Sequence, residues 1–405
     1  MALETIRALL AEHGQEHLLP FAEQMTDAER AAFQKQLEAL DFGLFDATET
    51  VERRGEISPI DAFTIEKRAA VCEENRALGR EMLKSGKVAA LMLAGGQGTR
   101  LGSASPKGCY NVGLTRDYFL FQAHVEKLAE LEREIGVKLP LYIMTSDKNH
   151  EETVAFFREH DFFGYGEENI GFFRQKSAPC TDFDKRLLME ERAKIATSPN
   201  GNGGWYVSLL ESECGKRMRE RGIEWITLFG VDNPLQRFCD AEFIGAAVRN
   251  AADCTVKVVR KAYPEEQMGV MCLEDGKPSM IAYAEMSDEL RYATDDCGEL
   301  LYTYGDILNM MFPVEALDRC MTEALPVHIA RKKIPFVDAD GTHHAPDAPN
   351  GFKYEMFLFD AMKYMNSVFL YEVKRENEFA PIKNLVGKDS VESARIMLKE
   401  NGVEL

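Results

Sequence analysis

A buried strand that ends in a glycine-rich loop constrains the fold of this chain most strongly. Residues 88–94 are apolar without polar alternation, which predicts a strand covered on both faces. Three of the four positions that follow, 95, 96 and 98, are glycine. Because glycine has no Cβ, main-chain N–H groups in such a loop can approach a bulky anion closely. Arg100 and Lys107 follow, so the segment is suited to hold phosphate oxygens.

Two common phosphate-binding loops do not match this segment. A Walker loop requires a lysine followed by Ser or Thr, whereas Lys107 is followed by Gly108. The dinucleotide-binding fingerprint is Gly-x-Gly-x-x-Gly, and here Gly96, Gly98 and Gly102 give Gly-x-Gly-x-x-x-Gly. Taken alone, the loop could be a structural turn, and this alternative stays open.

The sequence around the loop alternates apolar strand-like runs with helical periodicity. This alternation predicts an α/β fold with a mostly parallel sheet flanked by helices. Helices are expected at about 65–84, 119–135, 149–160, 205–221 and 242–250, and strands at 139–145, 170–174, 223–229 and 254–259. Open α/β sheets bind ligands beyond the carboxyl ends of their strands. Gly95, Thr145, Gln175 and Asp232 all follow such ends.

Three parts are expected along the chain. Residues 1–80 form an N-terminal helical segment, in which Thr26-Asp27 is a plausible helix N-cap. Residues 81–335 form the main α/β domain, which contains the glycine loop and a hairpin at 269–286. Residues 336–405 form a short C-terminal α+β segment.

Composition restricts the partners and the compartment. The net charge of −19 repels nucleic acid and anionic membranes, so a phosphate site must be a local basic pocket. The nine cysteines are an odd number without a Cys-x-x-Cys pair, which is typical of reduced thiols. The N-terminus has no signal-peptide core, and no apolar run has membrane-spanning length. We expect a cytoplasmic protein that binds neither nucleic acid nor membrane.

Several polar residues near strand ends could carry chemistry. Asp232 could hold Mg²⁺ against phosphates, or could cap the next turn. Gln175 could pair with a uracil edge, or could be a solvated loop amide. The loop 200–204 could approach a base or a sugar, or could form a tight turn before a helix. Lys353 and Lys383 have the composition of ordinary surface lysines.

The run Gly-Gly-x-Gly-Thr-Arg-Leu-Gly-x-x-x-Pro-Lys, from Gly95 to Lys107, resembles the signature of sugar-nucleotide pyrophosphorylases. More narrowly, the chain looks like the UDP-N-acetylhexosamine pyrophosphorylases and their bacterial uridylyltransferase relatives, over about residues 14–390. The resemblance implies a Rossmann-like nucleotidyltransferase fold of the GT-A type. It also implies transfer of UMP from UTP to a sugar 1-phosphate with Mg²⁺ as cofactor, by a monomer or homodimer.

The resemblance implies that residues 81–335 are the nucleotide- and sugar-binding catalytic domain and that residues 336–405 contribute active-site lysines. It also implies roles for individual residues. The expected catalytic residues are Arg100, Lys107, Asp232 and Lys383, with Asp232 as the metal ligand. The expected nucleotide-binding residues are Ala94, Gly95, Gly96, Gly98, Thr99, Lys107, Gln175, Gly201, Asp232 and Lys353. The expected sugar-binding residues are Asn202, Gly269, Tyr283, Glu285, Thr303, Phe357 and Phe359, although core packing is the ordinary reading of the two phenylalanines.

The sequence departs from the family pattern at the segments where the sugar is selected. Relatives that prefer N-acetylhexosamines carry Glu-Tyr-Ser-Glu-Ile where this chain has Ala282-Tyr-Ala-Glu-Met286, and Phe-Asn-Ala-Gly-Asn where it has Tyr302-Thr-Tyr-Gly-Asp306. A lost carboxylate and a lost amide can change hydroxyl recognition. N-acetylglucosamine 1-phosphate is the leading expectation, and glucose or galactose 1-phosphate is the alternative. A non-catalytic UDP-sugar sensor and a nicotinamide-dependent dehydrogenase are the rivals from other classes.

Overall fold

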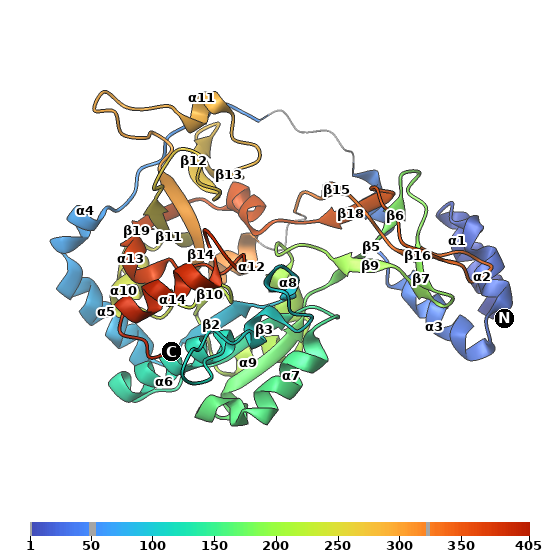
Figure 1. The fold of residues 1–405 in the computed structure, drawn as a ribbon, viewed down its shortest axis with the longest axis horizontal. Coiled ribbons are helices and arrows are strands. Elements are labelled where there is room, and N and C mark those ends of the chain that lie inside the picture. The colour runs from blue at the N-terminus through green and yellow to red at the C-terminus, as the bar shows by residue number, and fades with distance from the viewer. Residues whose placement is uncertain (1, 48–53, 321–324) are drawn as a thin grey trace. The chain divides into compact units, whose positions relative to one another are not determined.

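The computed structural model describes residues 2–47, 54–320 and 325–405 (Figure 1). These residues form two compact units. Unit 1 contains the described residues of 1–52, together with 175–204 and 325–358. Unit 2 contains the described residues of 53–174, 205–324 and 359–405. The three-part division at residues 80 and 335 stays a prediction.

Unit 2 is built on one ten-stranded sheet. Its main path is β1 (Ile57–Ser58), β12 (Val270–Glu274), β14 (Tyr304–Pro313), β10 (Trp225–Gly230), β2 (Val88–Leu93), β3 (Leu141–Thr145) and β4 (Ile170–Arg174). Off this path, β11 (Cys254–Arg260) pairs with β14 and with β19 (Val368–Glu372), and β13 (Lys277–Ile281) pairs with β12.

The strand directions divide the sheet into two regions. The run β10-β2-β3-β4 and the pair β11–β19 are parallel, whereas β14 is antiparallel to its neighbours and β12–β13 is a hairpin. Gly230 lies opposite Leu93, and Leu93 lies opposite Met144. The carboxyl ends of β10, β2 and β3 therefore meet at one edge, as predicted for Gly95, Thr145 and Asp232.

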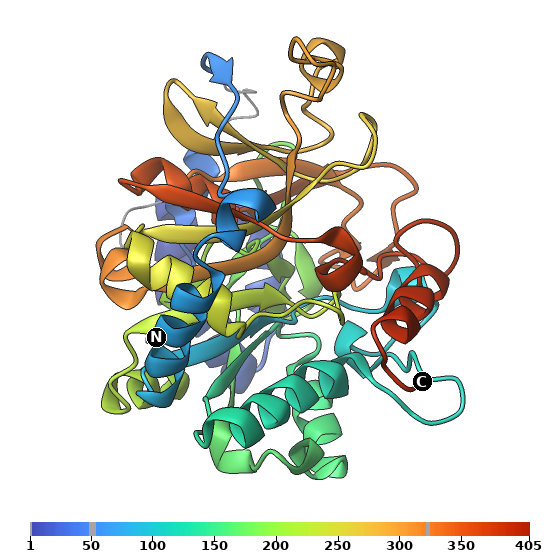
Figure 2. The same ribbon diagram turned by 90° about the vertical axis from the view of Figure 1, so that its left-hand side faces the viewer.

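Helices cover both faces of this sheet (Figure 2). Val88, Ala90 and Met92 belong to the same core cluster as the apolar residues of α6, whereas the intervening Ala89 and Leu91 are buried on the opposite face. The helices of unit 2 are α4 (Ile65–Ala69), α5 (Cys72–Lys84), α6 (Leu120–Ile135), α7 (His150–Glu159), α8 (Trp205–Leu210), α9 (Glu213–Glu220), α10 (Ala241–Asn250), α11 (Asp288–Arg291), α12 (Val314–Cys320), α13 (Arg375–Glu378) and α14 (Val391–Glu400).

Two predicted helices are interrupted. The helix expected at 65–84 is divided into α4 and α5, and the one expected at 205–221 is divided into α8 and α9. At the second break the Ser212 side chain accepts hydrogen bonds from the N–H groups of Cys214 and Gly215, and so begins a new helix. The hairpin expected at 269–286 is formed by β12 and β13 and turns at Asp275-Gly276, but its second strand ends at Ile281.

Unit 1 combines the N-terminal helices with short sheets. Its helices are α1 (Ala2–Glu12), α2 (Leu19–Gln24) and α3 (Asp27–Glu38), and Thr26 forms the predicted N-cap as part of a capping box with Glu29. Its strands are β5 (Ser177–Pro179), β6 (Thr181–Asp182), β7 (Met189–Glu191), β8 (Lys194–Ile195), β9 (Thr197–Pro199), β15 (His328–Lys332), β16 (Phe336–Val337), β17 (His343–His344) and β18 (Gly351–Glu355).

Short 3₁₀ helices connect many of these elements. They are η1 (Glu16–Leu18), η2 (Phe42–Asp46), η3 (Thr99–Leu101), η4 (Lys107–Cys109), η5 (Asp161–Gly164), η6 (Glu167–Asn169) and η7 (Leu358–Tyr364). Among the described helices, none has both the length and the apolar character that a membrane crossing requires.

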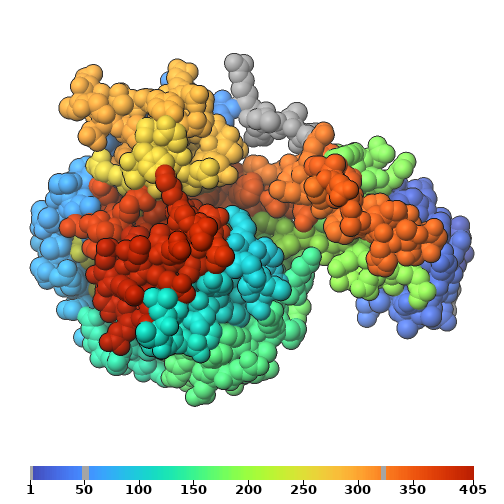
Figure 3. Space-filling model, viewed as in Figure 1, coloured from blue at the N-terminus to red at the C-terminus, as the bar shows by residue number. Residues whose placement is uncertain are grey.

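Within unit 2, the last residues of the chain contact residues 112–115. Arg395 Nε donates to Val112 O (2.8 Å), and Thr115 N donates to Leu405 O (3.0 Å). Figure 3 shows this contact as the red end of the chain lying against cyan residues. The same part of the chain contacts the sheet at Ile382, whose N–H donates to Asp232 O just after β10.

Candidate active site

The glycine loop is a turn with unpaired N–H groups. Gly98 N donates to Ser105 O (2.9 Å) and Lys107 N donates to Gly96 O (3.1 Å), which closes the loop on itself. Within the described residues, the N–H groups of Gly95, Gly96 and Gln97 have no hydrogen-bond partner. A Cβ placed on Gly96 would meet no protein atom within 4 Å. The loop therefore offers open space and free donors to an anion.

Asn149, which the sequence analysis did not select, holds this loop against the sheet. Its side-chain amide donates to Ala94 O (2.9 Å) and Gly96 O (3.4 Å), and its oxygen accepts from Ser146 N (2.8 Å). The side chain is fully buried. Asn149 was considered only as the start of a helix, because nothing in its local sequence indicates a distant partner.

Lys107 and Asp232 form an ion pair at the strand edge. Lys107 Nζ lies 3.4 Å from Asp232 Oδ2, and the side chains are 18% and 29% exposed. Lys107 begins η4, and Gly108 follows against the ring of Phe121, where a Cβ would lie 2.2 Å from a ring atom. The two expected catalytic residues are thus brought together, although they are far apart in the sequence.

Backbone contacts connect Asp232 to the C-terminal segment. Val231 N donates to Leu93 O (3.2 Å), which continues the pairing of β10 with β2. Ile382 N donates to Asp232 O (2.8 Å), so Lys383 follows directly. Lys383 Nζ lies 3.2 Å from Asp389 Oδ2, and half-exposed Lys383 is held by this local pair.

The remaining expected phosphate-binding residues of unit 2 lie on η3. Thr99 and Arg100 are both exposed, and no hydrogen bond or ion pair connects the Arg100 side chain to the described residues. A free guanidinium next to the loop can reach a phosphate without breaking an internal contact.

The expected sugar-binding residues of unit 2 fall into two groups. Gly269 and Thr303 flank the start of β14: Gly269 O accepts from Asp306 N (2.9 Å), and Thr303 O accepts from Lys261 N (2.8 Å). Tyr283 and Glu285 follow β13; Tyr283 is half-exposed, and Glu285 pairs with Arg54. Phe359 is half-buried in η7.

Asp306 is a titratable group in the same region. Its Oδ1 accepts from Leu308 N (3.0 Å), and burial raises the pKa of this carboxyl from 3.8 to about 7. The positive charge of Lys383 acts in the opposite direction. Asp306 lies in a segment that departs from the family pattern and is not among the expected site residues.

In unit 1 the structure brings Gln175, Gly201 and Asn202 together. Gln175 Nε2 donates to Gly201 O, and Asn202 Oδ1 accepts from Leu358 N (3.0 Å). Gly201 has φ +81°, and a Cβ there would lie 2.2 Å from Met356 O. The loop is therefore a tight turn that requires glycine, and the oxygen of the Gln175 amide is left for other contacts.

Lys353 and Phe357 lie on or next to β18 in unit 1. Lys353 is half-buried and lies opposite Ala330 in the pairing of β15 with β18. Phe357 is 41% exposed, and its ring centroid lies 4.7 Å from that of His328. Phe357 is therefore not a core residue, which makes its surface available to a ligand.

The donor set around Asp232 fits Mg²⁺. Among the described residues there is no group of three or more His, Cys, Asp or Glu side chains able to hold a metal ion. Mg²⁺ keeps several waters and commonly takes one or two protein carboxylates together with substrate phosphates. The partly exposed Asp232 carboxylate, next to unpaired N–H groups, meets this requirement.

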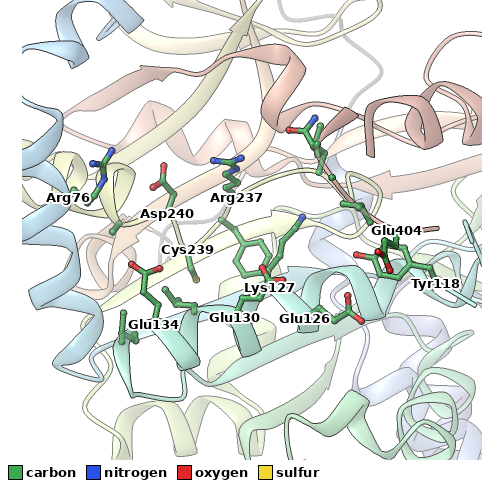
Figure 4. Close-up of a pocket in the computed structure, with 18 of the residues that line it drawn as sticks. Arg76, Tyr118, Glu126, Lys127, Glu130, Glu134, Arg237, Cys239, Asp240 and Glu404 are labelled. Carbon is green, nitrogen blue, oxygen red and sulfur yellow. The ribbon is translucent and has the colours of Figure 1, made fainter. Parts of the chain in front are cut away.

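Unit 2 also contains a pocket of about 660 Å³ that none of the expected site residues lines. It lies between α6 and the segment 237–241 (Figure 4). Glu126, Glu130 and Glu134 of α6 face it from one side, and Arg237 and Asp240 line the other. Because the glycine loop, Lys107 and Asp232 are all absent from its lining, this pocket is separate from the expected phosphate site.

Comparisons with known proteins found similar sequences and folds over nearly the whole chain. The family model described as UTP–glucose-1-phosphate uridylyltransferase matches residues 45–404. The chain is 37% identical to human UDP-N-acetylhexosamine pyrophosphorylase-like protein 1, covering 97% of this chain and 83% of that protein. It is 37% identical to UDP-N-acetylglucosamine pyrophosphorylase of Saccharomyces cerevisiae, with coverages of 96% and 84%. The fold is similar to that of Trypanosoma brucei uridine diphosphate N-acetylglucosamine pyrophosphorylase in complex with an inhibitor (TM-score 0.80, 28% identity, coverages 98% and 84%).

Proposed function

Because the chain belongs to the UTP–glucose-1-phosphate uridylyltransferase family, we propose that it transfers UMP from UTP to N-acetylglucosamine 1-phosphate and releases pyrophosphate. The predicted family resemblance, α/β fold and uridylyltransferase class are confirmed by the similarities over nearly the whole chain. The acceptor follows from the relatives named for N-acetylglucosamine.

The observation that supports this function most directly is the position of the Lys107–Asp232 pair beside the free N–H groups of residues 95–97. A triphosphate requires donors and cations for its oxygens, and a metal-binding carboxylate on the same side. Free N–H donors, a cation and a carboxylate lie together at the carboxyl edge of β2 and β10, and this arrangement supports the proposal. A plain structural turn would not need free donors next to a partly exposed ion pair.

Each expected residue then has a proposed role. In unit 2, the main chain of 94–99, Arg100 and Lys107 bind the triphosphate, and Lys383 neutralises the phosphate of the incoming sugar. In unit 1, Gln175 and Gly201 contact the uridine and Lys353 contacts a phosphate. The proposed sugar contacts are Asn202, Gly269, Tyr283, Glu285, Thr303, Phe357 and Phe359.

Asp232 is the proposed ligand of Mg²⁺. When bound, the ion would neutralise phosphate charge and orient the phosphate oxygens. Asp232 also holds Lys107, whose ammonium group can turn from the carboxylate to a phosphate when the nucleotide binds. The nine cysteines of the chain are free thiols, which supports a reducing, cytoplasmic compartment.

The reaction needs positioning rather than a covalent nucleophile. An oxygen of the sugar phosphate attacks the α-phosphorus of UTP in line, and the bond to the pyrophosphate oxygen breaks. The protein contributes electrostatic stabilisation: the loop N–H groups, Arg100 and Lys107 stabilise negative charge on the phosphates. Donors that are already oriented toward the phosphates contribute most to this stabilisation. No acid or base from the protein is required, since both phosphates are already ionised.

A panel of sugar 1-phosphates tests the function and the acceptor. Purified protein is given UTP, Mg²⁺ and the 1-phosphate of N-acetylglucosamine, N-acetylgalactosamine, glucose or galactose, and pyrophosphate release is measured. We expect the highest kcat/KM with N-acetylglucosamine 1-phosphate. Faster turnover of glucose or galactose 1-phosphate supports the alternative acceptor, and UDP-sugar binding without turnover supports the sensor.

A further inference from the structure

The turn that carries Asp232 is held by hydrogen bonds from its own Gln236 side chain, from the His124 side chain and from the main-chain N–H of Ile382. We call residues 230–236 the Asp232 turn. Gln236 Nε2 donates to Gly230 O, and His124 Nε2 lies 3.1 Å from Val231 O. Ile382 N donates to Asp232 O. The three carbonyl groups from 230 to 232 therefore all have fixed orientations, which is more restraint than an ordinary surface turn has.

His124 lies inside α6 and is completely buried. Its ring centroid lies 5.2 Å from that of Phe229 and 5.9 Å from that of Phe238. Because Val231 O can only accept, Nε2 carries the proton and donates. Nδ1 has no hydrogen-bond partner among the described residues. Burial lowers the pKa of His124 to about 3, so the ring stays neutral in this tautomer across the physiological range.

An apolar ring would satisfy this site better if packing were its only purpose. The neighbours of His124 are phenylalanines, and one of its nitrogens is buried without a partner, which costs stability. What the histidine adds is a single hydrogen bond, from Nε2 to Val231 O. That carbonyl belongs to the peptide group whose nitrogen is the N–H of Asp232.

We propose that His124 is a positioning residue for Asp232. By holding Val231 O, it fixes the peptide plane on the N-terminal side of Asp232, while Ile382 fixes the carbonyl on the C-terminal side. The carboxylate is then directed to the position where it meets Lys107. The proposal rests on the proposed function, in which Asp232 binds the metal and the nucleotide phosphates.

A second residue of the same helix supports this arrangement. Lys127, one turn after His124, donates from Nζ to Pro234 O and to Gln236 O (2.9 Å). In Figure 4 it extends from α6 toward the segment of Arg237. α6 therefore binds three carbonyl groups of the Asp232 turn, through His124 and Lys127.

Three substitutions at position 124 test the proposal. Gln can place its amide nitrogen where His has Nε2, Asn reaches only to the position of Nδ1, and Phe keeps the ring without a donor. The readout is the affinity of the full-length protein for Mn²⁺–UTP, measured by electron paramagnetic resonance, with thermal unfolding as a check of folding. We expect His124→Asn and His124→Phe to bind about tenfold more weakly, and His124→Gln to bind within about twofold of the parent protein.

An Asp232→Asn variant separates the two hypotheses. If Asp232→Asn weakens Mn²⁺–UTP binding but folded His124→Phe and His124→Asn do not, the positioning role is wrong and the proposed function stands. If Asp232→Asn binds as tightly as the parent protein, the proposed role of Asp232 fails, and the role of His124 fails with it. We expect His124→Phe to add no further weakening in the Asp232→Asn background.

Lys127→Met provides a second test should the His124 variants not fold. The Lys127 side chain lines the pocket, so we expect this substitution to disturb the core less than a change at His124. Binding weakened about threefold supports anchoring of the turn by α6. Unchanged binding overturns it.

Discussion

Lys107 Nζ lies 3.4 Å from Asp232 Oδ2, which places a cation at the start of η4 and a carboxylate just after β10 beside the same loop. We expect Lys107→Ala to lower kcat/KM by about 10²–10³-fold, because an oriented cation at the phosphates is lost. The unfolding temperature should change little, since a partly exposed pair contributes under about 1 kcal/mol. Lys87→Ala, which removes a surface pair with Glu224, is the control and should keep full activity. Near-normal turnover of Lys107→Ala would contradict the role.

Asp306 predicts a pH-dependent stability. Its pKa is about 7 when folded and 3.8 ordinarily, so the folded state holds the proton more tightly. At pH below 3.8 the carboxyl is neutral in both the folded and the unfolded protein, so its burial does not lower the stability. As the pH rises toward 7, the unfolded state loses its proton first, and stability decreases. We expect Asp306→Asn to raise Tm by about 2–4 °C at pH 8 and to leave it almost unchanged near pH 4. An equal shift at both pH values would rule out ionisation as the cause.

The loop at Gly201 in unit 1 should not tolerate a side chain at this position. An alanine there has φ +81° and a Cβ 2.2 Å from Met356 O, so we expect it to destabilise the protein by about 2–4 kcal/mol. Gly341→Ala is a matched control, because its φ is +88° and its Cβ meets nothing within 4 Å; it should cost only about 1 kcal/mol. Thermal unfolding of the two variants measures both losses of stability. If the two substitutions lowered the free energy of unfolding equally, backbone strain alone would explain both losses, and the contact of the new Cβ with Met356 O would contribute nothing.

The buried pair of Lys257 and Glu378 predicts strong coupling. Lys257 Nζ donates to Glu378 Oε2 (2.6 Å) and to Arg237 O (2.7 Å), and its side chain is 0% exposed. Lys257→Met should lower the free energy of unfolding by about 3–5 kcal/mol, since Glu378 is left charged and unpaired. Adding Glu378→Gln should restore more than half of that loss. Urea titration of the two single variants and the double variant measures the coupling, and strictly additive losses would disprove it.

The local part of the site was predictable from sequence. The strand 88–93, the loop that follows and the position of Asp232 after β10 depend on apolar runs, glycine spacing and chain order. The helix breaks at 70–71 and 211–212 were missed, because helical periodicity continues through both while a serine cap decides the second. The roles assigned to individual site residues remain predictions for the experiments above.

The sequence by itself determined the parallel strands next to the glycine loop, the glycine spacing of that loop and the family that the chain resembles, because these follow from spacing between near neighbours. Only the tertiary structure decided that Asn149 holds the glycine loop, that His124 holds Val231 O and that Ile382 meets Asp232. Hydrogen bonds between distant segments depend on how the helices and the C-terminal segment pack on the sheet. No short pattern records that packing, since each of these side chains is ordinary in its own surroundings.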